Sequence, residues 1–384
     1  MPRRILFPFV GDSLGGSQIA TLTLIRQLDA ARHVPVLVLE QAGPLADRLT
    51  ALRLPYLTLG PRALPGEAPR PLQALARLTR LLPANLALLR REDVWAVHTN
   101  DLRMHLAWGP AAKLAGRRFF WHVHVKLNDN ALWRGLARLA DGVLVVSETA
   151  RRTLPARVRE TAVLTPNPFE VGEPPPERLA ARQALAQELR LDPSLPWLCF
   201  VGNLTRQKRP EVFVEALSAL GRPACGLIVG QDRDSLQAAL QAQARSGGVA
   251  ERLRFLGYRE GLAPILAAAD IVVAPGVNES FGRVPVEAML AGTPVVAAAS
   301  GGHLETVADG ETGLLVPAND ARAFAGAIVR LLDDAALAAR LAEAARRQAR
   351  ERYDPRSYAE RTMRLYDAVA GANAARLSAS SSER

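Results

Sequence analysis

The stretch that decides the fold is DIVVAPGVNESFGRVPVEAMLAGTPVVAA, residues 270–298. It contains two short apolar runs, 271–274 and 295–298, which are typical of buried strands in a parallel sheet. Between them lies VEAMLA, a helix-like segment that follows Pro285, a residue suited to the first turn of a helix. Gly292 can end that helix. The order strand, loop, helix, strand predicts an α/β fold with a parallel sheet.

The same alternation recurs along most of the chain. Short apolar runs, from ILFPF at the start to GVLVVS, are separated by helix-like stretches such as SQIATLTLIRQLDA. The segment PNPFEVGEPPPE, residues 166–177, interrupts this order and is rich in proline and acidic residues, as interdomain linkers are. The alternation restarts at WLCFVG and continues to TGLLVP. We therefore predict two similar doubly wound domains.

The composition of the segments sets the predicted boundaries. Residues 353–370 read as a C-terminal helix that could cross back to the first domain, and ANAARLSASSSER is polar and rich in small residues. The predicted parts are an N-terminal domain at 1–170, a linker at 171–177, a C-terminal domain at 178–352, the helix at 353–370 and a disordered tail at 371–384.

Positive charge is concentrated in the first half of the chain. The 384 residues carry a net charge of +10; residues 1–170 hold 23 Lys and Arg against 13 Asp and Glu, whereas residues 171–384 hold 25 of each. This asymmetry indicates an anionic partner for the first half, such as a phospholipid surface, a lipid-linked phosphate or an acidic polymer. The alternative is a general preference for arginine, since the chain has 45 Arg and 3 Lys. No nucleic acid partner is expected.

The cysteines and the apolar runs bear on the compartment. Cys199 and Cys225 both lie in apolar runs, where free cysteines behave as small hydrophobic residues of a reducing compartment. No apolar run reaches membrane-spanning length, and MPRRILFPFV lacks the pattern of a signal peptide. Residues 70–91 are basic and partly amphipathic, which fits either a helix on an anionic membrane or a helix that covers the sheet. We predict a cytoplasmic protein, with peripheral contact at the inner membrane face as an option.

The loop after the run 271–274 carries the first candidate site. Residues 280–283 precede a helix, so their backbone N–H groups lack helical partners and can bind an anion such as phosphate. Glu279 and Glu287 would repel phosphate, and their carboxylates are better suited to accept hydrogen bonds from sugar hydroxyls. The alternative is that Glu287 is a favourable charge in the first helical turn and Glu279 an ordinary loop residue.

Several motifs in fixed order resemble glycosyltransferase family 4, retaining enzymes of the GT-B fold. They are GNLTRQKRPEVFVEAL and NESFGRVPVEAMLAGTPVVAAASGGHLETVADGETGLLVP in the second half, and LGGSQIATLTLIRQL, VHTND and VVSETARRTL in the first. The resemblance covers nearly the whole chain. It implies two Rossmann-like domains facing across a cleft, the first binding the acceptor and the second the nucleotide sugar. The implied activity is sugar transfer from a nucleotide-diphosphate donor, UDP- or GDP-linked, to a hydroxyl acceptor.

The resemblance assigns roles in the second domain. The position of Glu287 contacts the ribose, that of Glu279 the transferred sugar, and that of Lys208 the diphosphate. Asn203 stands where the family often has arginine, so either Arg206 supplies the missing cation or the affinity for phosphate is lower. The donor-binding set is Gly16, Asn203, Arg206, Lys208, Glu279, Ser280, Phe281, Gly282, Arg283 and Glu287.

In the first domain, the resemblance places His124 near the transferred sugar. His122 lies two residues earlier on the same strand face, so either histidine could occupy that position. Lys126 is an additional cation beside them, and Gly15 precedes Gly16 in a glycine loop that lets the backbone approach a ligand closely. The catalytic set is His124, Lys208 and Glu279; the acceptor-side set is Gly15, His122 and Lys126.

Two further expectations concern metals and the reaction. Asp232 and Asp234 match a metal-binding pattern of a different glycosyltransferase fold, but they open a helix-like segment, which favours N-capping. We expect no metal and no cofactor other than the nucleotide sugar. The basic first half favours acceptors in lipid-linked or surface polysaccharide synthesis, with a soluble metabolite as the alternative. A sugar-nucleotide epimerase, a sugar phosphorylase and a catalytically silent binding module of the same fold remain alternative functions.

Overall fold

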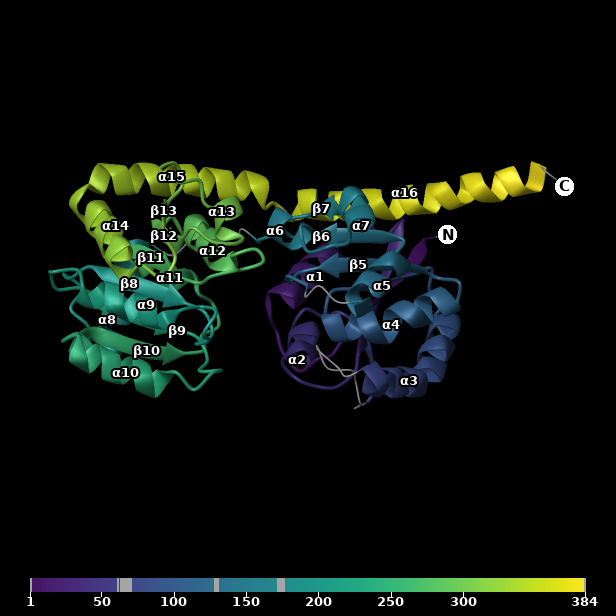
Figure 1. Ribbon diagram of the computed structural model, residues 1–384, viewed down its shortest axis with the longest axis horizontal. Coiled ribbons are helices and arrows are strands. Elements are labelled where there is room, and N and C mark those ends of the chain that lie inside the picture. The colour runs from purple at the N-terminus through teal and green to yellow at the C-terminus, as the bar shows by residue number, and fades with distance from the viewer. Residues whose placement is uncertain (1, 61, 63–70, 128–130, 171–176, 383–384) are drawn as a thin grey trace. The chain divides into compact units, whose positions relative to one another are not determined.

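The computed structural model describes residues 2–60, 62, 71–127, 131–170 and 177–382. The chain forms two compact units (Figure 1). The N-terminal unit comprises the chain up to Pro168 together with the segment from Pro355 onward, and the C-terminal unit comprises Phe169–Asp354. The chain therefore passes between the units twice.

The N-terminal unit is built on a seven-stranded sheet in the order β3-β2-β1-β4-β5-β6-β7, with all neighbours parallel. Its strands are β1 (Arg3–Phe9), β2 (His33–Leu39), β3 (Tyr56–Thr58), β4 (Ala96–Thr99), β5 (Arg118–Val123), β6 (Gly142–Val145) and β7 (Val163–Leu164). Its helices are α1 (Gly16–Gln27), α2 (Pro44–Ala51), α3 (Pro71–Arg91), α4 (Leu102–Leu114), α5 (Ala131–Leu139), α6 (Glu148–Arg151), α7 (Ala156–Thr161) and α16 (Pro355–Ser382).

The C-terminal unit repeats this plan with six parallel strands in the order β10-β9-β8-β11-β12-β13. Its strands are β8 (Trp197–Val201), β9 (Cys225–Val229), β10 (Leu253–Gly257), β11 (Ile271–Ala274), β12 (Val295–Ala298) and β13 (Leu314–Val316). Its helices are α8 (Arg178–Leu189), α9 (Pro210–Ser218), α10 (Gln237–Ser246), the 3₁₀ turn η1 (Ala250–Arg252), α11 (Ala263–Ala268), α12 (Arg283–Ala291), α13 (His303–Thr306), α14 (Ala321–Asp333) and α15 (Ala335–Arg352).

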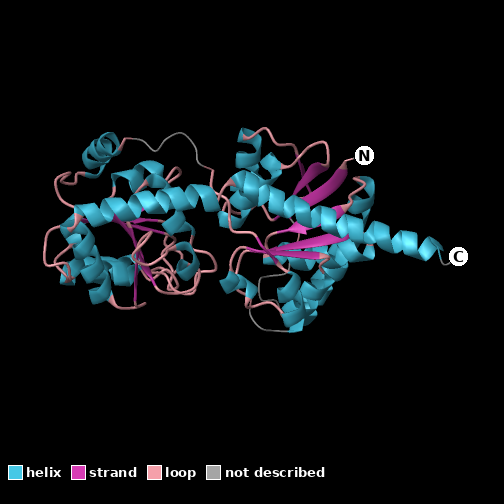
Figure 2. Ribbon diagram, turned by 90° about the horizontal axis from the view of Figure 1, so that it is seen from above, coloured by secondary structure: helices cyan, strands magenta, loops and turns pink. Residues whose placement is uncertain are grey.

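Both sheets are enclosed by helices on their two faces, as Figure 2 shows. The strands are apolar throughout because both of their faces are buried. In each sheet the strand order reverses once, between β1 and β4 and between β8 and β11. Such a switch point leaves a crevice at the carboxyl ends of the two strands, which is where doubly wound folds bind ligands. The predicted α/β class and its two doubly wound sheets are confirmed.

The last helix belongs to the N-terminal unit. Tyr358, Ala359 and Tyr366 of α16 are buried in the same core cluster as Phe7 of β1 and Leu24 of α1. The sequence analysis placed a disordered tail at 371–384; the structure instead continues α16 to Ser382. The linker predicted at 171–177 falls, apart from Glu177, outside the described residues.

The stretch 270–298 forms β11, a loop, α12 and β12 as predicted, with one difference. The helix begins at Arg283, which the sequence analysis placed in the loop before it, because Gly282 adopts φ +83° at the N-cap and turns the chain into the helix there. Glu287 therefore lies in the second turn, and its predicted place in the first turn was wrong. Gly292 ends the helix in a left-handed conformation, as predicted.

The sequence analysis also made predictions about the two cysteines and about the basic helix at residues 70–91. Cys199 and Cys225 are both buried and free, in agreement with their apolar surroundings. Helix α3 buries Leu81, Leu88 and Leu89 and packs against α4, so most of its second half serves the core. Within the described part of the chain, no helix combines the length and the apolar character needed to cross a bilayer.

Candidate active site

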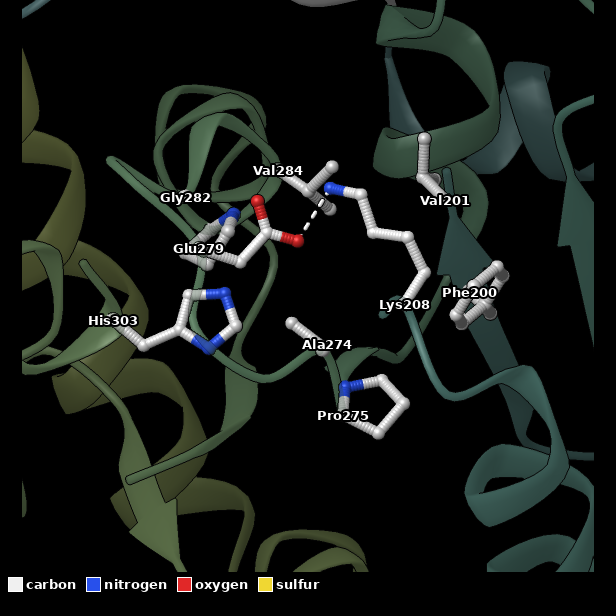
Figure 3. A pocket seen from close by; sticks show the side chains of 11 residues that line it. Phe200, Val201, Lys208, Ala274, Pro275, Glu279, Gly282, Val284 and His303 are labelled. Atoms are coloured by element: carbon white, nitrogen blue, oxygen red, sulfur yellow. Dashed lines mark ion pairs between the residues drawn. The ribbon is translucent and has the colours of Figure 1, made fainter. Parts of the chain in front are cut away.

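A pocket lies at the switch point of the C-terminal unit (Figure 3). Its walls come from the carboxyl ends of β8 and β11, the loop after each strand, the start of α12 and the first residue of α13. The lining residues are Phe200, Val201, Lys208, Ala274, Pro275, Gly276, Glu279, Gly282, Val284, Pro285 and His303. Three of the predicted site residues, Lys208, Glu279 and Gly282, are thus brought together here.

An ion pair spans this pocket. Lys208 lies in the turn between β8 and α9, Glu279 lies in the loop after β11, and Lys208 Nζ is 2.5 Å from Glu279 Oε1. The side chains retain 28% and 13% of their exposure, so both charges are accessible from the pocket yet shielded from bulk water. Electrostatic attraction is stronger in such a shielded place than at an open surface. The pocket therefore offers one cation and one strong hydrogen-bond acceptor.

The loop that carries Glu279 is held by the segment before α13. Gly302 N donates to the Glu279 carbonyl at 2.8 Å, and Asn278 N donates to Ser300 Oγ at 3.0 Å. A Cβ atom at Gly302 would lie 2.4 Å from the Phe281 carbonyl oxygen. Only glycine permits this close approach. The Gly301–Gly302 pair therefore holds the backbone of the Glu279 loop in position at the pocket.

Phe281 points into the core rather than into the pocket. Its ring lies 6.1 Å from Phe169 and 5.6 Å from Tyr353, and all three side chains are buried. The Arg283 guanidinium lies 4.3 Å from the centre of the Phe169 ring and pairs with Glu287 at 3.2 Å. Arg283 and Glu287 are absent from the lining of this pocket. The side chains predicted to meet the ribose and the donor thus bind each other in this structure.

Asn203 and Arg206 lie on the surface beside the pocket. Asn203 Oδ1 accepts from Gln231 N at 3.3 Å, and Arg206 N donates to the carboxylate of Asp234 at 2.9 Å. Both side chains are exposed. Ser280 is half-buried in the loop next to Glu279. None of these side chains reaches the pocket lining described above.

One carboxylate of the Asp-x-Asp sequence contacts the start of a helix, although the N-cap residue is Leu236 and Asp234 accepts from Arg206 N instead. Asp232 accepts from Leu236 N at 2.7 Å and from Gln237 N at 3.1 Å, at the start of α10. Over the described ranges, no three His, Cys, Asp or Glu side chains cluster as metal ligands.

His303 is a pocket residue that the sequence analysis missed. Its ring is 2% exposed, and its Nδ1 lies 3.2 Å from the carbonyl oxygen of Ala298. Burial lowers the pKa of His303; the negative charge of Glu279 opposes this effect and the positive charge of Lys208 adds to it. The signal that could have found it is its position directly after Gly301–Gly302 and its being the sole histidine in residues 169–354.

The switch point of the N-terminal unit holds a charge network that the sequence analysis also missed. Arg103 Nη1 is 2.7 Å from Asp12 Oδ2, and Arg103 Nε is 3.3 Å from Asp101 Oδ1. Asp12 follows β1, and Asp101 follows β4 and caps α4. Burial alone would raise the pKa of Asp12, but the hydrogen bond and charge of Arg103 outweigh burial and lower it. Arg103 is therefore bound between two carboxyl groups.

The predicted glycine loop lies at the same switch point. Gly15 is the N-cap of α1, and its N–H donates to Gln18 Oε1 at 3.0 Å. Gly16 begins the helix. The N-terminus of α1 therefore faces the carboxyl edge of the sheet, where its backbone N–H groups can approach a ligand.

The structure separates the two histidines of β5 and its extension. His122 is fully buried, and its Nδ1 is 3.3 Å from the Tyr358 hydroxyl of α16. The His124 ring is tilted by 34° against that of His122, with ring centres 4.3 Å apart, so the two side chains lie on the same strand face. The His124 residue is partly exposed, but both of its ring nitrogens are buried. Lys126 lies beyond it and is exposed.

Two parallel doubly wound units, one with an ion-paired pocket at its switch point, form the arrangement of the GT-B fold. Solved structures agree with the fold. Anabaena Alr3699/HepE in complex with UDP and glucose superposes with a TM-score of 0.79 at 21% identity, over 95% of this chain and 100% of that one. Sucrose-phosphate synthase from Thermosynechococcus elongatus gives 0.75 at 24% identity, over 96% and 100%.

Sequence comparison gives the family. Residues 14–172 match the family described as Glycosyltransferase Family 4, and residues 196–334 match Glycosyl transferases group 1. A D-inositol 3-phosphate glycosyltransferase of Xylanimonas cellulosilytica is 31% identical over 380 residues, covering 89% of either chain. A phosphatidyl-myo-inositol mannosyltransferase of Mycobacterium leprae is 37% identical over 238 residues, 60% of this chain and 59% of that one. The protein belongs to glycosyltransferase family 4.

Proposed function

We propose that this glycosyltransferase moves a sugar from a nucleotide-diphosphate donor, UDP- or GDP-linked, to a hydroxyl acceptor with retention of anomeric configuration. The observation that carries the proposal is the pocket of the C-terminal unit, where Lys208, Glu279 and the N-terminus of α12 meet at the switch point. The cation and the helix amides suit a diphosphate, and the carboxylate suits neutral hydroxyls.

The ion pair suggests how the donor is bound. A diphosphate carries more negative charge than one carboxylate, so it competes with Glu279 for Lys208 Nζ. Once Lys208 turns to the phosphate, Glu279 is released to accept hydrogen bonds from the sugar. During transfer the leaving diphosphate gains charge, and Lys208 with the amides of Phe281 and Gly282 stabilises it. This fixed positive potential takes the place of a metal ion, so we propose a metal-independent reaction.

Three further predicted donor-binding residues are Glu287, Arg283 and Arg206. Glu287 and Arg283 have to exchange their present partners, whereas Arg206 provides charge at the surface. Glu287 must exchange Arg283 for the ribose hydroxyls, at the cost of one exposed ion pair of the i, i+4 type, about 0.3–0.5 kcal/mol. Arg206 is exposed beside the pocket and can reach a phosphate as it binds.

On the N-terminal unit, we assign the sugar- or acceptor-facing role to His124 rather than to His122. His122 is fully buried and its Nδ1 contacts the Tyr358 hydroxyl, whereas His124 keeps partial exposure, and its buried ring nitrogens have to be uncovered before they meet a ligand. Gly15 and Lys126 complete the acceptor side, and Gly16 remains a donor-binding residue. A peptide N–H at the start of α1 and an exposed ammonium both favour an acceptor that carries a negative group.

The charge of the N-terminal unit supports a phosphate-bearing acceptor in glycoconjugate synthesis. With α16 included, this unit holds 28 Lys and Arg against 15 Asp and Glu, and the C-terminal unit holds 20 against 23. The two relatives named above take their names from inositol 3-phosphate and phosphatidyl-myo-inositol, which both carry phosphate. The proposal includes a cytoplasmic location and contact of the basic unit with an anionic membrane surface.

The decisive experiment is a screen of UDP- and GDP-linked sugars against phosphorylated and unphosphorylated hydroxyl acceptors, with products detected by mass. We expect a glycosylated acceptor, activity that survives EDTA, and a melting temperature raised by the donor, since a ligand at 100 times its Kd adds about 2.7 kcal/mol of stability. An altered nucleotide sugar formed without acceptor indicates an epimerase, and a requirement for inorganic phosphate indicates a phosphorylase. If neither nucleotides nor nucleotide sugars shift the melting temperature, a binding module replaces the proposed enzyme.

A further inference from the structure

His303 lines the pocket, but neither the Lys208–Glu279 ion pair nor the proposed diphosphate binding assigns it a role. Figure 3 shows its ring beside Glu279, with the side chain of Lys208 reaching in from the opposite wall. The ring is almost fully buried, yet it lines the pocket. A buried polar ring normally has both nitrogens satisfied. Here only Nδ1 has a hydrogen-bond partner among the described residues.

The contact at Nδ1 decides what the other nitrogen can do. The Ala298 carbonyl oxygen can only accept, so Nδ1 must carry the proton and donate it. The lowered pKa keeps the ring neutral at pH 7. In that tautomer Nε2 bears a lone pair and is a pure acceptor. Nε2 lies on the edge of the ring that faces Gly282, 3.3 Å from the place where a Cβ atom on Gly282 would be.

The groups around Nε2 indicate which kind of ligand can donate a hydrogen bond to its lone pair. A phosphate oxygen is itself an acceptor and would be repelled by Nε2. Lys208 is the nearby donor, but it is paired with Glu279 and serves the diphosphate in the proposed function. What fits two adjacent acceptors, a carboxylate and an imidazole nitrogen, is a pair of neighbouring hydroxyl groups that each donate one hydrogen bond.

We propose that His303 is a specificity-determining residue for the transferred sugar, whose Nε2 accepts a hydrogen bond from one sugar hydroxyl next to the hydroxyl held by Glu279. This inference rests on the proposed function and extends it, because it names the substrate group that the pocket reads. It predicts a donor sugar with two vicinal hydroxyls on the face turned toward α13. A sugar lacking either hydroxyl leaves a buried acceptor unpaired, and the site discriminates against it.

The test compares donor preferences between variants. The probe is whichever of UDP-glucose, UDP-N-acetylglucosamine and GDP-mannose the wild type turns over, together with its monodeoxy analogues. In the wild type, loss of the hydroxyl bound by Nε2 should lower kcat/KM about 3- to 10-fold, the effect of one net hydrogen bond. We compare the kcat/KM of the full donor with that of each monodeoxy analogue. In His303→Leu this ratio should fall to about 1 for the single analogue that lacks the hydroxyl bound by Nε2, and the ratios for the other analogues should stay unchanged. His303→Gln, which keeps a side-chain acceptor, should restore part of the preference.

Thr306→Val is the matched control. It removes the hydrogen bond from Thr306 Oγ1 to the Gly302 carbonyl in the same helical turn without touching the pocket, so all ratios should equal those of the wild type. A purely structural His303 would lower activity with every analogue alike, and unchanged ratios in His303→Leu would overturn the inference.

A second measurement uses the wild type alone. Imidazole ¹⁵N spectra should show one ring with a protonated Nδ1 and a bare Nε2 whose shift moves with the nucleotide sugar but not with the bare nucleoside diphosphate. Equal shifts with both ligands would contradict the assignment. If the wild type transfers no sugar and its activity is the same as that of Lys208→Ala, the proposed function is wrong, and the inference about His303 is wrong with it. If the wild type is active and Lys208→Ala is not, unchanged ratios in His303→Leu reject the His303 assignment alone.

Discussion

The two sheets reverse their strand order in the same way but differ in local charge at the point of reversal. In the C-terminal unit, Lys208 faces one carboxylate across an open pocket at the start of α12. In the N-terminal unit, Arg103 is bound between Asp12 and Asp101, so two carboxylates surround one cation. The first arrangement can give its cation to an anion, and the second has a negative balance and no cation to spare.

The difference runs against the net charges of the units. The N-terminal unit is strongly basic and the C-terminal unit slightly acidic, yet the pocket suited to a diphosphate is in the acidic unit. Net charge acts over the whole surface and steers association. The affinity of a site depends on the few charges and amides within a few ångströms of the ligand. The charge of a unit therefore indicates its partner but does not locate its anion site.

The strongest test of this comparison removes the cation from each switch point in turn. Lys208→Ala should lower kcat about 10²- to 10³-fold, the usual effect of removing one group that stabilises a developing charge. Arg103→Gln should leave kcat within about 10-fold, because Arg103 is occupied by its two carboxylates. Steady-state rates with saturating donor measure both. Equal losses in the two variants would show that the switch points are alike after all.

The next test concerns the glycines at the two ends of α12. Gly282→Ala should lower the free energy of unfolding by about 1–3 kcal/mol, since φ is +83° and the new Cβ would lie 2.6 Å from His303 Cδ2. Gly292→Ala has a similar φ of +77° but open space around it, and it should cost about 1 kcal/mol of backbone strain alone. Urea unfolding measures both, and donor binding should weaken only in Gly282→Ala. An equal cost at the two ends would mean that contact with His303 is unimportant.

The units should also differ in their response to acid. Burial lowers the pKa of His98 to about 3, and it lowers those of His105 and His122. The unfolded chain protonates these groups near pH 6.5, so the stability they support is complete above pH 6.5 and is lost as the pH falls toward 3. At pH 5 the loss from His98 alone is about 2 kcal/mol.

The measurement exploits the distribution of tryptophan. Trp197 is the single tryptophan of the C-terminal unit, so fluorescence of a Trp197→Phe variant reports the N-terminal unit alone. Its unfolding midpoint in urea should fall between pH 7 and pH 5. A His98→Phe/Tyr366→Phe variant should show a smaller fall. A midpoint independent of pH would contradict neutral buried histidines.

The smallest effect separates two buried tyrosines, one from each unit. The Tyr366 hydroxyl is 2.5 Å from His98 Nδ1, so Tyr366→Phe should lower the free energy of unfolding by about 1 kcal/mol. The Tyr353 hydroxyl is buried without a hydrogen-bond partner among the described residues, and its pKa is raised to about 12 by burial. Tyr353→Phe should therefore be neutral or stabilising in urea unfolding at pH 7. A larger loss of stability in Tyr353→Phe than in Tyr366→Phe would contradict the hydrogen bond assigned to Tyr366 and the absence of one at Tyr353.

Much of the fold was readable because it depends on local pattern. Apolar runs such as 271–274 are strands because both sheet faces are covered, and Gly292 ends α12 because it tolerates the left-handed region. The sequence analysis placed Arg283 in the loop before α12, whereas Gly282, with φ +83°, is the N-cap and Arg283 begins the helix. Residues 371–382, which the sequence analysis assigned to the tail, continue α16.

By itself, the sequence determined the two doubly wound units and the family, and it predicted Lys208 and Glu279 as site residues, because periodicity and motif order are properties of adjacent residues. Tertiary structure alone decided that these two side chains bind each other, that Arg283 pairs with Glu287, that His303 lines the pocket with Nδ1 against the Ala298 carbonyl and that Arg103 is bound by Asp12 and Asp101. Each of these depends on the distance and burial of side chains that fold together from separate loops. Distance and burial set the charge and the hydrogen-bonding capacity of a group, and no local pattern encodes them.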